Sequence, residues 1–314
     1  MVFYLADIHR LINALRLADY RFVALSYAIS LLWLVVRGFA WRTLLKNKAT
    51  LSQAFFTVNE GYLLNNLLPF RLGEVGRAFL MSRKAGLDFM GVLSTILIER
   101  ALDLLIAAGL LLSTLPFVIG ASWAREAAIL AGGIVLAGLV CLYLLARYSD
   151  WTSRQFESLL SRWQFLAKLN GQEGRISRQV KAFLSGLAVL TDGGLFLRAV
   201  AWILLDWGIS VFQYATFLLA FFPSIKLLWA PFCLAFVALG VAAPSSPGAV
   251  GVMELSTVAA LALFGLDSTL ALAMALTAHL SNYLITGILG AYALARDGET
   301  LSGLYQRVRR LPQK

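Results

Sequence analysis

The stretch Asn65–Phe79, NNLLPFRLGEVGRAF, interrupts an otherwise apolar chain. Within fifteen positions it holds two amides, a proline, two glycines, two arginines and a glutamate. Proline cannot continue a helix, and glycine tolerates the tight backbone that follows. The stretch therefore predicts a helix that breaks at Pro69 and resumes near Gly73, with charged side chains at the break.

The composition around this break indicates a membrane protein. The chain has 314 residues, of which 60% are hydrophobic and 14% are charged, whereas about a quarter of the residues in a soluble domain are charged. Leu/Ala-rich apolar runs of about twenty residues recur along the chain, which is the length of a spanning helix rather than of a barrel strand. We expect an all-α, polytopic helical membrane protein and not a soluble enzyme with one anchor.

The apolar runs divide the chain into two membrane halves, residues 1–148 and 195–314. We expect complete spans at Phe22–Ala40, Met90–Phe117, Glu126–Tyr148, Leu195–Phe222 and Thr269–Leu294. The polar segment 149–194 has apolar residues at helical spacing, which predicts a cytoplasmic amphipathic linker at the membrane surface. Residues Met1–Leu15 are too polar for a cleaved signal peptide and predict an interfacial amphipathic helix.

Two further apolar segments are interrupted and predict broken hairpins, at residues 51–84 and 227–264. The first contains Asn59, Glu60, Asn65 and Asn66 before Pro69. The second ends in PSSPGAVG, where its breaking residues are Pro244, Pro247, Gly248 and Gly251. A single constant offset aligns Pro69 with Pro244, Gly73 with Gly248, Val75 with Val250 and Gly76 with Gly251. This alignment suggests an internal duplication.

The basic residues set the expected orientation. They cluster at Arg42–Lys48, at Arg83 and Lys84, at Arg147–Lys181 and at Arg307–Lys314. Cytoplasmic loops of membrane proteins are enriched in Lys and Arg, so the net charge of +10 points to topology rather than to a nucleic-acid partner. We expect an integral protein of a bacterial-type inner membrane with a cytoplasmic C-terminus.

With this orientation the first hairpin enters and leaves on the cytoplasmic side, and the second enters from the opposite side. The halves then form two inverted repeats, each with a broken or re-entrant helical hairpin, which is the sequence pattern of a transport site. An alternative, in which residues 227–264 form two complete short spans, satisfies the same charge pattern.

The first break carries the candidate substrate-binding residues Asn65, Asn66, Arg71, Gly73 and Arg77. The two amides can satisfy non-helical backbone at membrane depth. Free N–H groups of a helix that begins at Gly73 suit a phosphate, with Arg71 beside them and Arg77 one turn further on. The alternative is a local ion pair between Glu74 and Arg77 that only fixes the turn.

A second charged cluster, ERALD, lies inside the span Met90–Phe117. Glu99, Arg100 and Asp103 share one face of the helix, and three charges cannot face lipid. Pairing of Glu99 or Asp103 with Arg71 or Arg77 follows as the expected contact. We interpret Glu99, Arg100 and Asp103, together with Glu74 and Glu254, as gating or ion-pair positions. Their ion pairs either lock the structure or open when a lipid phosphate competes, and the sequence leaves both alternatives open.

The remaining polar residues give weaker hypotheses. Asp206 with Trp207 and Gln213 either lines a cavity or forms a hydrogen bond between helices, and we favour the hydrogen bond. His279 with Asn282 is expected to form a bond between helices rather than a proton relay. A dyad of Ser245 or Ser246 with His279 is disfavoured because PSSPG lacks the G-x-S-x-G pattern. The sequence contains no Walker, GxGxxG or paired-aspartate motif, so we expect no catalytic residue, no metal and no cofactor.

Three motifs together resemble a known family: GYLLNNLLPFRLGEVGRAFLMSRKAG, then ERALDLL, then PSSPGAVGVMEL. They resemble the lysylphosphatidylglycerol synthase transmembrane region, a family of flippase-like integral membrane proteins, over nearly the whole chain. The resemblance implies movement of lipids between leaflets. Two departures are that the soluble aminoacyl-transfer domain is not found, so synthase activity is not expected, and that the additional first span of many members is missing or reduced to Met1–Leu15.

By the same resemblance, the motif positions inherit the family's core. These positions are Asn65, Asn66, Pro69, Arg71, Gly73, Glu74, Arg77, Glu99, Arg100, Asp103, Pro244, Pro247, Gly248, Gly251 and Glu254. The favoured hypothesis is a translocator of an anionic phospholipid or a polyprenyl-phosphate-linked lipid. The alternatives are a membrane enzyme that uses Glu99, Asp103 or Glu254 as a base on a lipid phosphate, and a partner subunit that does not transport.

Overall fold

The computed structural model describes residues 8–118, 122–162, 174–242, 246–299 and 303, and every regular element in these ranges is a helix. Three helices are long and apolar enough to cross a membrane: α2 (Tyr20–Leu44), α10 (Gly193–Phe221) and α13 (Ser268–Arg296). Residues Gly132–Arg147 and Ser149–Leu159, which meet at an 88° bend, add a fourth if they form one broken span. The chain is therefore an all-α, polytopic membrane protein.

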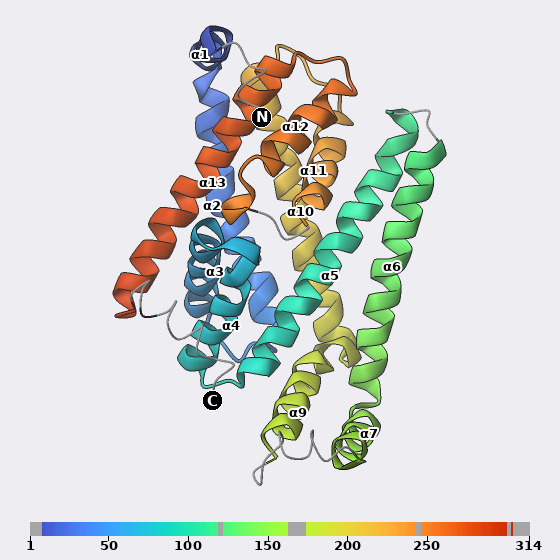
Figure 1. Ribbon diagram of the computed structural model, residues 1–314. Helices are drawn as coiled ribbons and strands as arrows, with labels where there is room; N and C mark the ends of the chain where they lie inside the picture. Colours follow the sequence, from blue (N-terminus) through green and yellow to red (C-terminus); the bar gives the residue numbers. More distant parts are fainter. Residues whose placement is uncertain (1–7, 119–121, 163–173, 243–245, 300–302, 304–314) are drawn as a thin grey trace.

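Five other helices complete the frame around these spans. They are α1 (Ile8–Leu17), α5 (Phe89–Thr114), α6 (Ser122–Arg147), α7 (Ser149–Arg162) and α9 (Arg175–Leu187). Figure 1 shows α5 and α6 running side by side along the bundle, with α7 and α9 at one end of it. At 26 residues α5 has the length of a span, but it carries Glu99, Arg100 and Asp103, so its position depends on partners for those charges.

The first hairpin consists of α3 (Leu51–Leu67) and α4 (Leu72–Ala85). α3 begins with a capping box in which Thr50 and Gln53 bond to each other's backbone N–H groups. Leu68 is extended, as the residue before a proline prefers to be. A short 3-10 turn, Pro69–Arg71, then reverses the chain through two left-handed residues, Phe70 at φ 57° and Arg71 at φ 55°.

The two arms of this hairpin approach each other through glycines. A Cβ on Gly73 would lie 2.2 Å from the Gly61 carbonyl oxygen and 2.6 Å from the Asn65 nitrogen. A Cβ on Gly76 would lie 2.5 Å from a methyl group of Leu64. Gly73 is thus buried against α3, and its lack of a side chain allows the arms to pack.

The second hairpin consists of α11 (Trp229–Gly240) and α12 (Val252–Ala262), with a 3-10 turn at Pro247–Ala249 between them. Gly248 at φ 60° and Ala249 at φ 59° are again left-handed. Pro244 and Ser245, two of the residues expected near this break, lie outside the described ranges.

The two breaks resemble each other in backbone conformation, in a register that differs from that of the sequence alignment. Both consist of a proline followed by two left-handed residues, Pro69–Arg71 and Pro247–Ala249. Each precedes a helix whose third residue is a glutamate, Glu74 in α4 and Glu254 in α12. By this backbone similarity Pro69 matches Pro247, whereas the sequence alignment placed it with Pro244, which lies outside the described ranges. The duplication and its register stay predictions.

The halves also pack reciprocally. α2 and α10 lie against each other, α3 packs on α13, and α11 packs on α5. The two turns, Pro69–Arg71 and Pro247–Ala249, contact each other where the hairpin tips meet. In Figure 1 the α3–α4 hairpin lies toward one end of the long helices and the α11–α12 hairpin toward the other. Re-entry of both hairpins within a membrane, and the inverted repeat built on it, stay predictions.

Ion pairs bring the end of α13 to the open end of the first hairpin. Lys84 contacts Asp297 and lies 2.6 Å from Glu60, and Arg83 lies 2.6 Å from Glu299. These contacts put residues 297 and 299 on the same side as Lys84, as the expected topology requires. The basic tail Arg307–Lys314 lies outside the described ranges.

The linker and the N-terminal segment are helical where they are described. α9 crosses α5 at close range, since a Cβ on Gly186 would lie 2.2 Å from the Gly91 carbonyl oxygen. α7 joins α9 through an ion pair of 2.9 Å between Glu157 and Lys181. Within Met1–Leu15, residues from Ile8 onward form the start of α1.

Candidate functional site

A cluster of charged side chains joins the long helices at the level where the hairpin tips meet. Arg37 on α2, Arg77 on α4, Glu99 and Asp103 on α5, and Asp206 on α10 are each 8% exposed or less. Charges at this depth are costly, about 3 kcal/mol or more each, unless they are paired. The pairing therefore decides how these four helices, α2, α4, α5 and α10, fit together.

Arg77 and Glu99 form the pair that the ERALD segment led us to expect. The guanidinium donates two hydrogen bonds to the carboxylate, of 3.2 and 2.9 Å, and lies 4.2 Å from the ring centre of Trp41. A two-pronged contact of this kind is stronger and more directional than a single bond. It ties the first hairpin to α5 and leaves Arg77 closed off from any ligand.

Arg37 is the centre of the cluster, and sequence reasoning missed it. It donates to both oxygens of Asp103, at 3.1 and 3.0 Å, and lies 2.7 Å from Asp206 and 3.5 Å from Glu99. The indole N–H of Trp207 also donates to Asp103, at 3.0 Å. A lone arginine in the apolar run LLWLVVRGFAW, Leu31–Trp41, was the available signal, because the cost of a buried charge applies to it as it does to ERALD.

Arg71, Glu74 and Arg100 form a more exposed group beside this cluster. Glu74 lies 2.9 Å from Arg100 and 3.6 Å from Arg71, and Arg100 lies 3.4 Å from Asp103. Arg71 also donates to the carbonyl oxygen of Val241, at 2.6 Å. Glu74 thus pairs across to α5 and not with Arg77, because Arg77 turns inward to Glu99.

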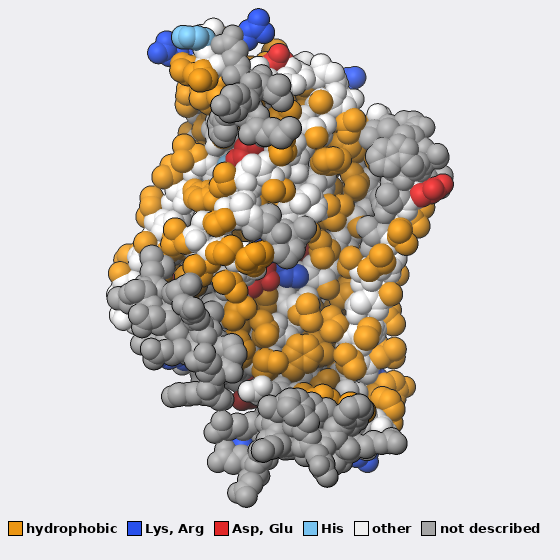
Figure 2. Space-filling view, viewed as in Figure 1, with side chains coloured by type: hydrophobic (Ala, Val, Ile, Leu, Met, Phe, Trp, Pro, Cys, Tyr) orange, Lys and Arg blue, Asp and Glu red, His pale blue; other side chains and the backbone are white. Residues whose placement is uncertain are grey.

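These groups line a cavity of about 660 Å³. Its charged wall is formed by Arg37, Arg71, Glu74, Arg100 and Asp103. Its apolar wall comes mainly from α5 and α11, and includes Leu93, Leu97, Leu104, Leu234 and Ala238. Figure 2 shows acidic and basic side chains together at mid-height in a surface otherwise covered by hydrophobic groups. A cavity with one polar and one apolar wall suits an amphipathic molecule, with a charged head group and a hydrophobic chain.

Of the five residues expected to bind substrate, only Arg71 lines this cavity. Arg77 is closed by Glu99, and Gly73 and Asn65 are held in the contact between α3 and α4. Asn66 donates to the hydroxyl of Thr286 on α13, at 3.2 Å. Gly73 and Asn65 therefore serve the packing of α3 against α4, and Asn66 links the break to α13. Phosphate binding at the N–H groups near Gly73 stays a prediction.

The second break is fixed by a different set of contacts. His279 on α13 lies 2.5 Å from Glu254 through Nδ1 and 2.9 Å from the Gly248 carbonyl oxygen through Nε2. Its bond partners are these groups rather than Asn282. The hydroxyl of Ser246 donates to the Val250 carbonyl oxygen, at 2.7 Å, rather than to His279.

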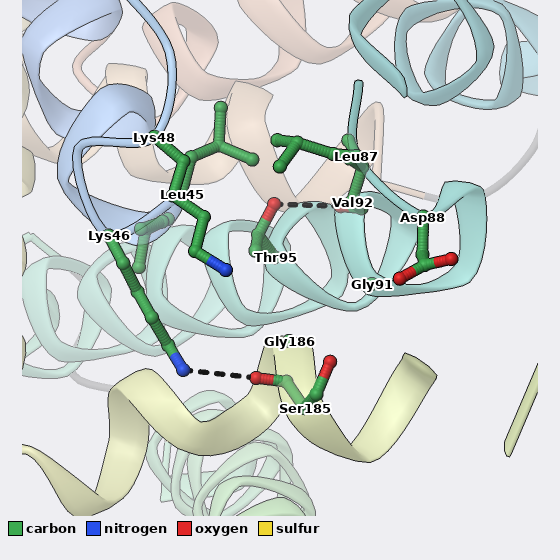
Figure 3. A pocket seen from close by; sticks show the side chains of 11 residues that line it. Leu45, Lys46, Lys48, Leu87, Asp88, Gly91, Val92, Thr95, Ser185 and Gly186 are labelled. Carbon is green, nitrogen blue, oxygen red and sulfur yellow. Dashed lines mark hydrogen bonds between the residues drawn. The ribbon is translucent and has the colours of Figure 1, made fainter. Parts of the chain in front are cut away.

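Figure 3 shows a smaller hollow between the α2–α3 turn and α9. Its volume is about 70 Å³, which is too small for a lipid, and Lys46 spans it to donate to the Ser185 carbonyl oxygen at 3.1 Å. Partial burial, together with the charge of Lys48, lowers the pKa of Lys46 below its ordinary value of 10.5. We interpret this hollow as part of the packing of the linker.

The fold and the cluster define an all-α integral membrane protein with a cavity, part charged and part apolar, where two broken hairpins meet. Residues 1–290 match the lysylphosphatidylglycerol synthase TM region, and the chain belongs to this family. A UPF0104 membrane protein of Methanothermobacter thermautotrophicus is 24% identical over 298 residues, which cover 90% of this chain and 85% of the relative. No solved structure matches the chain. Membership gives the protein a lipid-related role in the membrane.

Proposed function

We propose that the protein translocates a lipid with an anionic, phosphate-bearing head group between membrane leaflets. The observation that carries this proposal is the cavity of about 660 Å³, which combines guanidinium groups with an apolar wall at the meeting point of two broken hairpins. A head group needs compensation for its charge at this depth, and its acyl or polyprenyl chain needs an apolar surface.

Arg71 and Arg100 are the groups that suit the phosphate. The side chains of Arg71 and Arg100 are 33% and 25% exposed, whereas those of Arg37 and Arg77 are 6% and 3% exposed. Among the described residues, Arg71 has one carboxylate within 4 Å, Glu74 at 3.6 Å, and it donates to the Val241 carbonyl oxygen at 2.6 Å. Its other N–H groups can therefore bind an incoming oxyanion. Guanidinium groups bind phosphate with two parallel hydrogen bonds, so Arg71 can hold the head group in a fixed orientation.

The contacts between the hairpins suggest how the cavity opens. Arg71, in the first break, donates to Val241 at the end of α11, which is the first arm of the second hairpin. A lipid phosphate that competes for Arg71 replaces this contact and separates the two tips. Broken helices that meet between repeats are typical of transporters with alternating access.

The geometry supports a translocator over a lipid-phosphate enzyme. Glu99 receives both donors of Arg77, Asp103 receives Arg37 and Trp207, and Glu254 caps the Gly251 N–H at 2.7 Å. A general base needs a carboxylate within reach of the proton that it removes. Each of these three carboxylates is instead occupied by a structural donor.

Reconstitution of the purified protein in vesicles with a leaflet-reporter lipid tests the proposal, with phosphatidylglycerol and a polyprenyl phosphate as separate probes. Loss of a charge-assisted hydrogen bond, about 1.5–3 kcal/mol, predicts about a tenfold to hundredfold slower exchange for Arg71→Gln. Arg71→Lys should weaken transport more than folding, because it keeps the charge and loses the two-pronged geometry. Arg154→Gln, on the exposed face of α7, is the matched control.

Equal exchange rates for wild type, both Arg71 variants and the control, at matched protein content, would contradict the proposal. So would exchange no faster than in empty vesicles with either probe lipid. Turnover of a probe with a change in its mass would instead support the enzyme.

A further inference from the structure

The second break contains a buried imidazole whose two nitrogens both face hydrogen-bond acceptors. His279 and Glu254 are 6% and 5% exposed. Nδ1 of His279 faces Glu254 Oε1 at 2.5 Å, and Nε2 faces the Gly248 carbonyl oxygen at 2.9 Å. The other carboxylate oxygen, Oε2, accepts the Gly251 N–H at 2.7 Å and so fixes the first turn of α12.

Counting protons shows what this arrangement requires. A neutral imidazole has one N–H and can donate to only one of two acceptors. Both contacts are satisfied only if the pair holds one additional proton, as an imidazolium beside a carboxylate or as a neutral ring beside a carboxylic acid. Without that proton, a ring lone pair of His279 faces either the carboxylate or the Gly248 carbonyl oxygen, and that contact is unsatisfied. Because an unsatisfied buried polar group costs free energy, loss of the proton favours separation of the Pro247–Ala249 turn from His279.

The corresponding position in the first hairpin makes the same contact with a permanent charge. Glu74 and Glu254 are both the third residue of the helix after a break. Glu74 pairs with Arg100 on α5, and Glu254 pairs with His279 on α13. One break is therefore held by a guanidinium, which stays charged, and the other by an imidazole, the side-chain type that most readily gains and loses a proton.

The surroundings leave Glu254 as the ionisable partner of His279. The Tyr283 ring lies edge-on to the imidazole at 4.8 Å between ring centres, one turn along the same helix. Among the described residues of the other helices that pack on α13, Glu60 of α3 pairs with Lys84, and Asp206 of α10 pairs with Arg37 of α2. His9, Arg10 and Arg16 of α1 are exposed.

We propose that Glu254 and His279 form a proton-binding site, and that the bound proton holds the second break closed against α13. Loss of the proton releases the turn Pro247–Ala249, which contacts the first break at the cavity. This inference rests on the proposed function for its role in transport: the proton is the coupling ion, and a pH gradient gives lipid movement a direction. The proton site itself is independent of that role.

The first test follows the site in protein with isotope-labelled histidine. The chain has two histidines, and His9, exposed on α1, serves as the internal reference. In parallel, the labelling rate of a Val250→Cys variant reports on the break, in a Cys141→Ser background whose other cysteine, Cys233, is buried. Because the thiolate is the reacting species, labelling of any cysteine speeds up as pH rises, so the rate is divided by that of an exposed reference cysteine, Arg154→Cys, in the same background. We expect the His279 signal to titrate and this ratio to rise over the same pH range, by up to about tenfold for each pH unit below the midpoint.

The second test imposes a pH gradient on the transport assay. Wild type and the control His9→Gln should exchange lipid faster in one gradient direction than in the other. Glu254→Gln and His279→Arg should lose that difference, the latter because it places a permanent cation where the first hairpin has Arg100.

The outcomes separate the two proposals. A His279 signal whose pH dependence is unchanged by Glu254→Gln overturns the proton site even if lipid exchange is normal. So does labelling of Val250→Cys, in the Cys141→Ser background with Glu254 and His279 intact, that only follows the pH dependence of the reference cysteine. Coupled titration and labelling without lipid exchange keep the proton site and reject the translocator. Lipid exchange that responds equally to both gradient directions rejects the coupling role.

Discussion

The pair Arg77–Glu99 gives an asymmetric prediction for stability. In Glu99→Gln, Arg77 remains 2% exposed and keeps the Trp41 ring, but it loses its carboxylate. Stranding one member of a buried pair typically costs about 3–5 kcal/mol. In Arg77→Gln, by contrast, Glu99 keeps Arg37 at 3.5 Å and Arg100 at 3.9 Å, so we expect a smaller loss of about 1–3 kcal/mol.

The measurement is the free energy of unfolding in mixed micelles for wild type, both single variants and the double variant. Both single variants lose the same contact, so the loss of unfolding free energy in the double variant should be smaller than the sum of the two single losses. The difference, which is the interaction energy, should be about 0.5–3 kcal/mol. Losses that add to within about 0.5 kcal/mol would refute the pairing. A larger loss in Arg77→Gln than in Glu99→Gln would refute the argument that neighbouring cations compensate Glu99.

Three further predictions concern packing, pH and topology. Gly73→Ala should abolish the folded, monodisperse fraction in size-exclusion chromatography because its Cβ meets the backbone of α3, whereas Gly109→Ala, which faces open space on α5, should be tolerated. Burial lowers the pKa of Lys46 in the folded state below its ordinary value of 10.5. At a pH just below 10.5, the unfolded state therefore binds more protons than the folded state. The free energy of unfolding should rise with pH in that window, and Lys46→Met should flatten the rise. Cysteines at Lys48 and Arg83, both in exposed positions, should react with an impermeant reagent from the same membrane face, and opposite faces would reject the re-entrant hairpin.

The local features of the fold were predictable from the sequence. Apolar runs and their spacing gave the long helices, and the first hairpin was expected at residues 51–84 and is observed at Leu51–Ala85. The break at Pro69 was also predicted, because a proline before a charged, glycine-containing stretch acts on the backbone of its own neighbours. The matching turn at Pro247 was not, because recognising it required the backbone conformation of Gly248 and Ala249.

The roles of the charged residues were predicted only in part. Burial of Glu99, Arg100 and Asp103 on one helix face implied partners, and Arg77 was one of two candidates for Glu99. The same cost of burial applied to Arg37, but a single arginine in an apolar run carries no spacing pattern to draw attention to it. Gly73 was assigned to phosphate binding because its position at a helix start suggested it, and the sequence did not reveal that it also packs closely against α3.

The sequence by itself determined that this is an all-α membrane protein, where its first hairpin breaks, and that charges lie at membrane depth. These properties follow from neighbouring residues, through helical periodicity, proline geometry and the cost of removing charge from water. Only the tertiary structure decided which cation meets which anion and which side chains face the cavity. The partners of Asp103 illustrate the reason, because Arg37 lies 66 residues before it and Trp207 lies 104 residues after it, and only the packing of α2, α5 and α10 brings the three together.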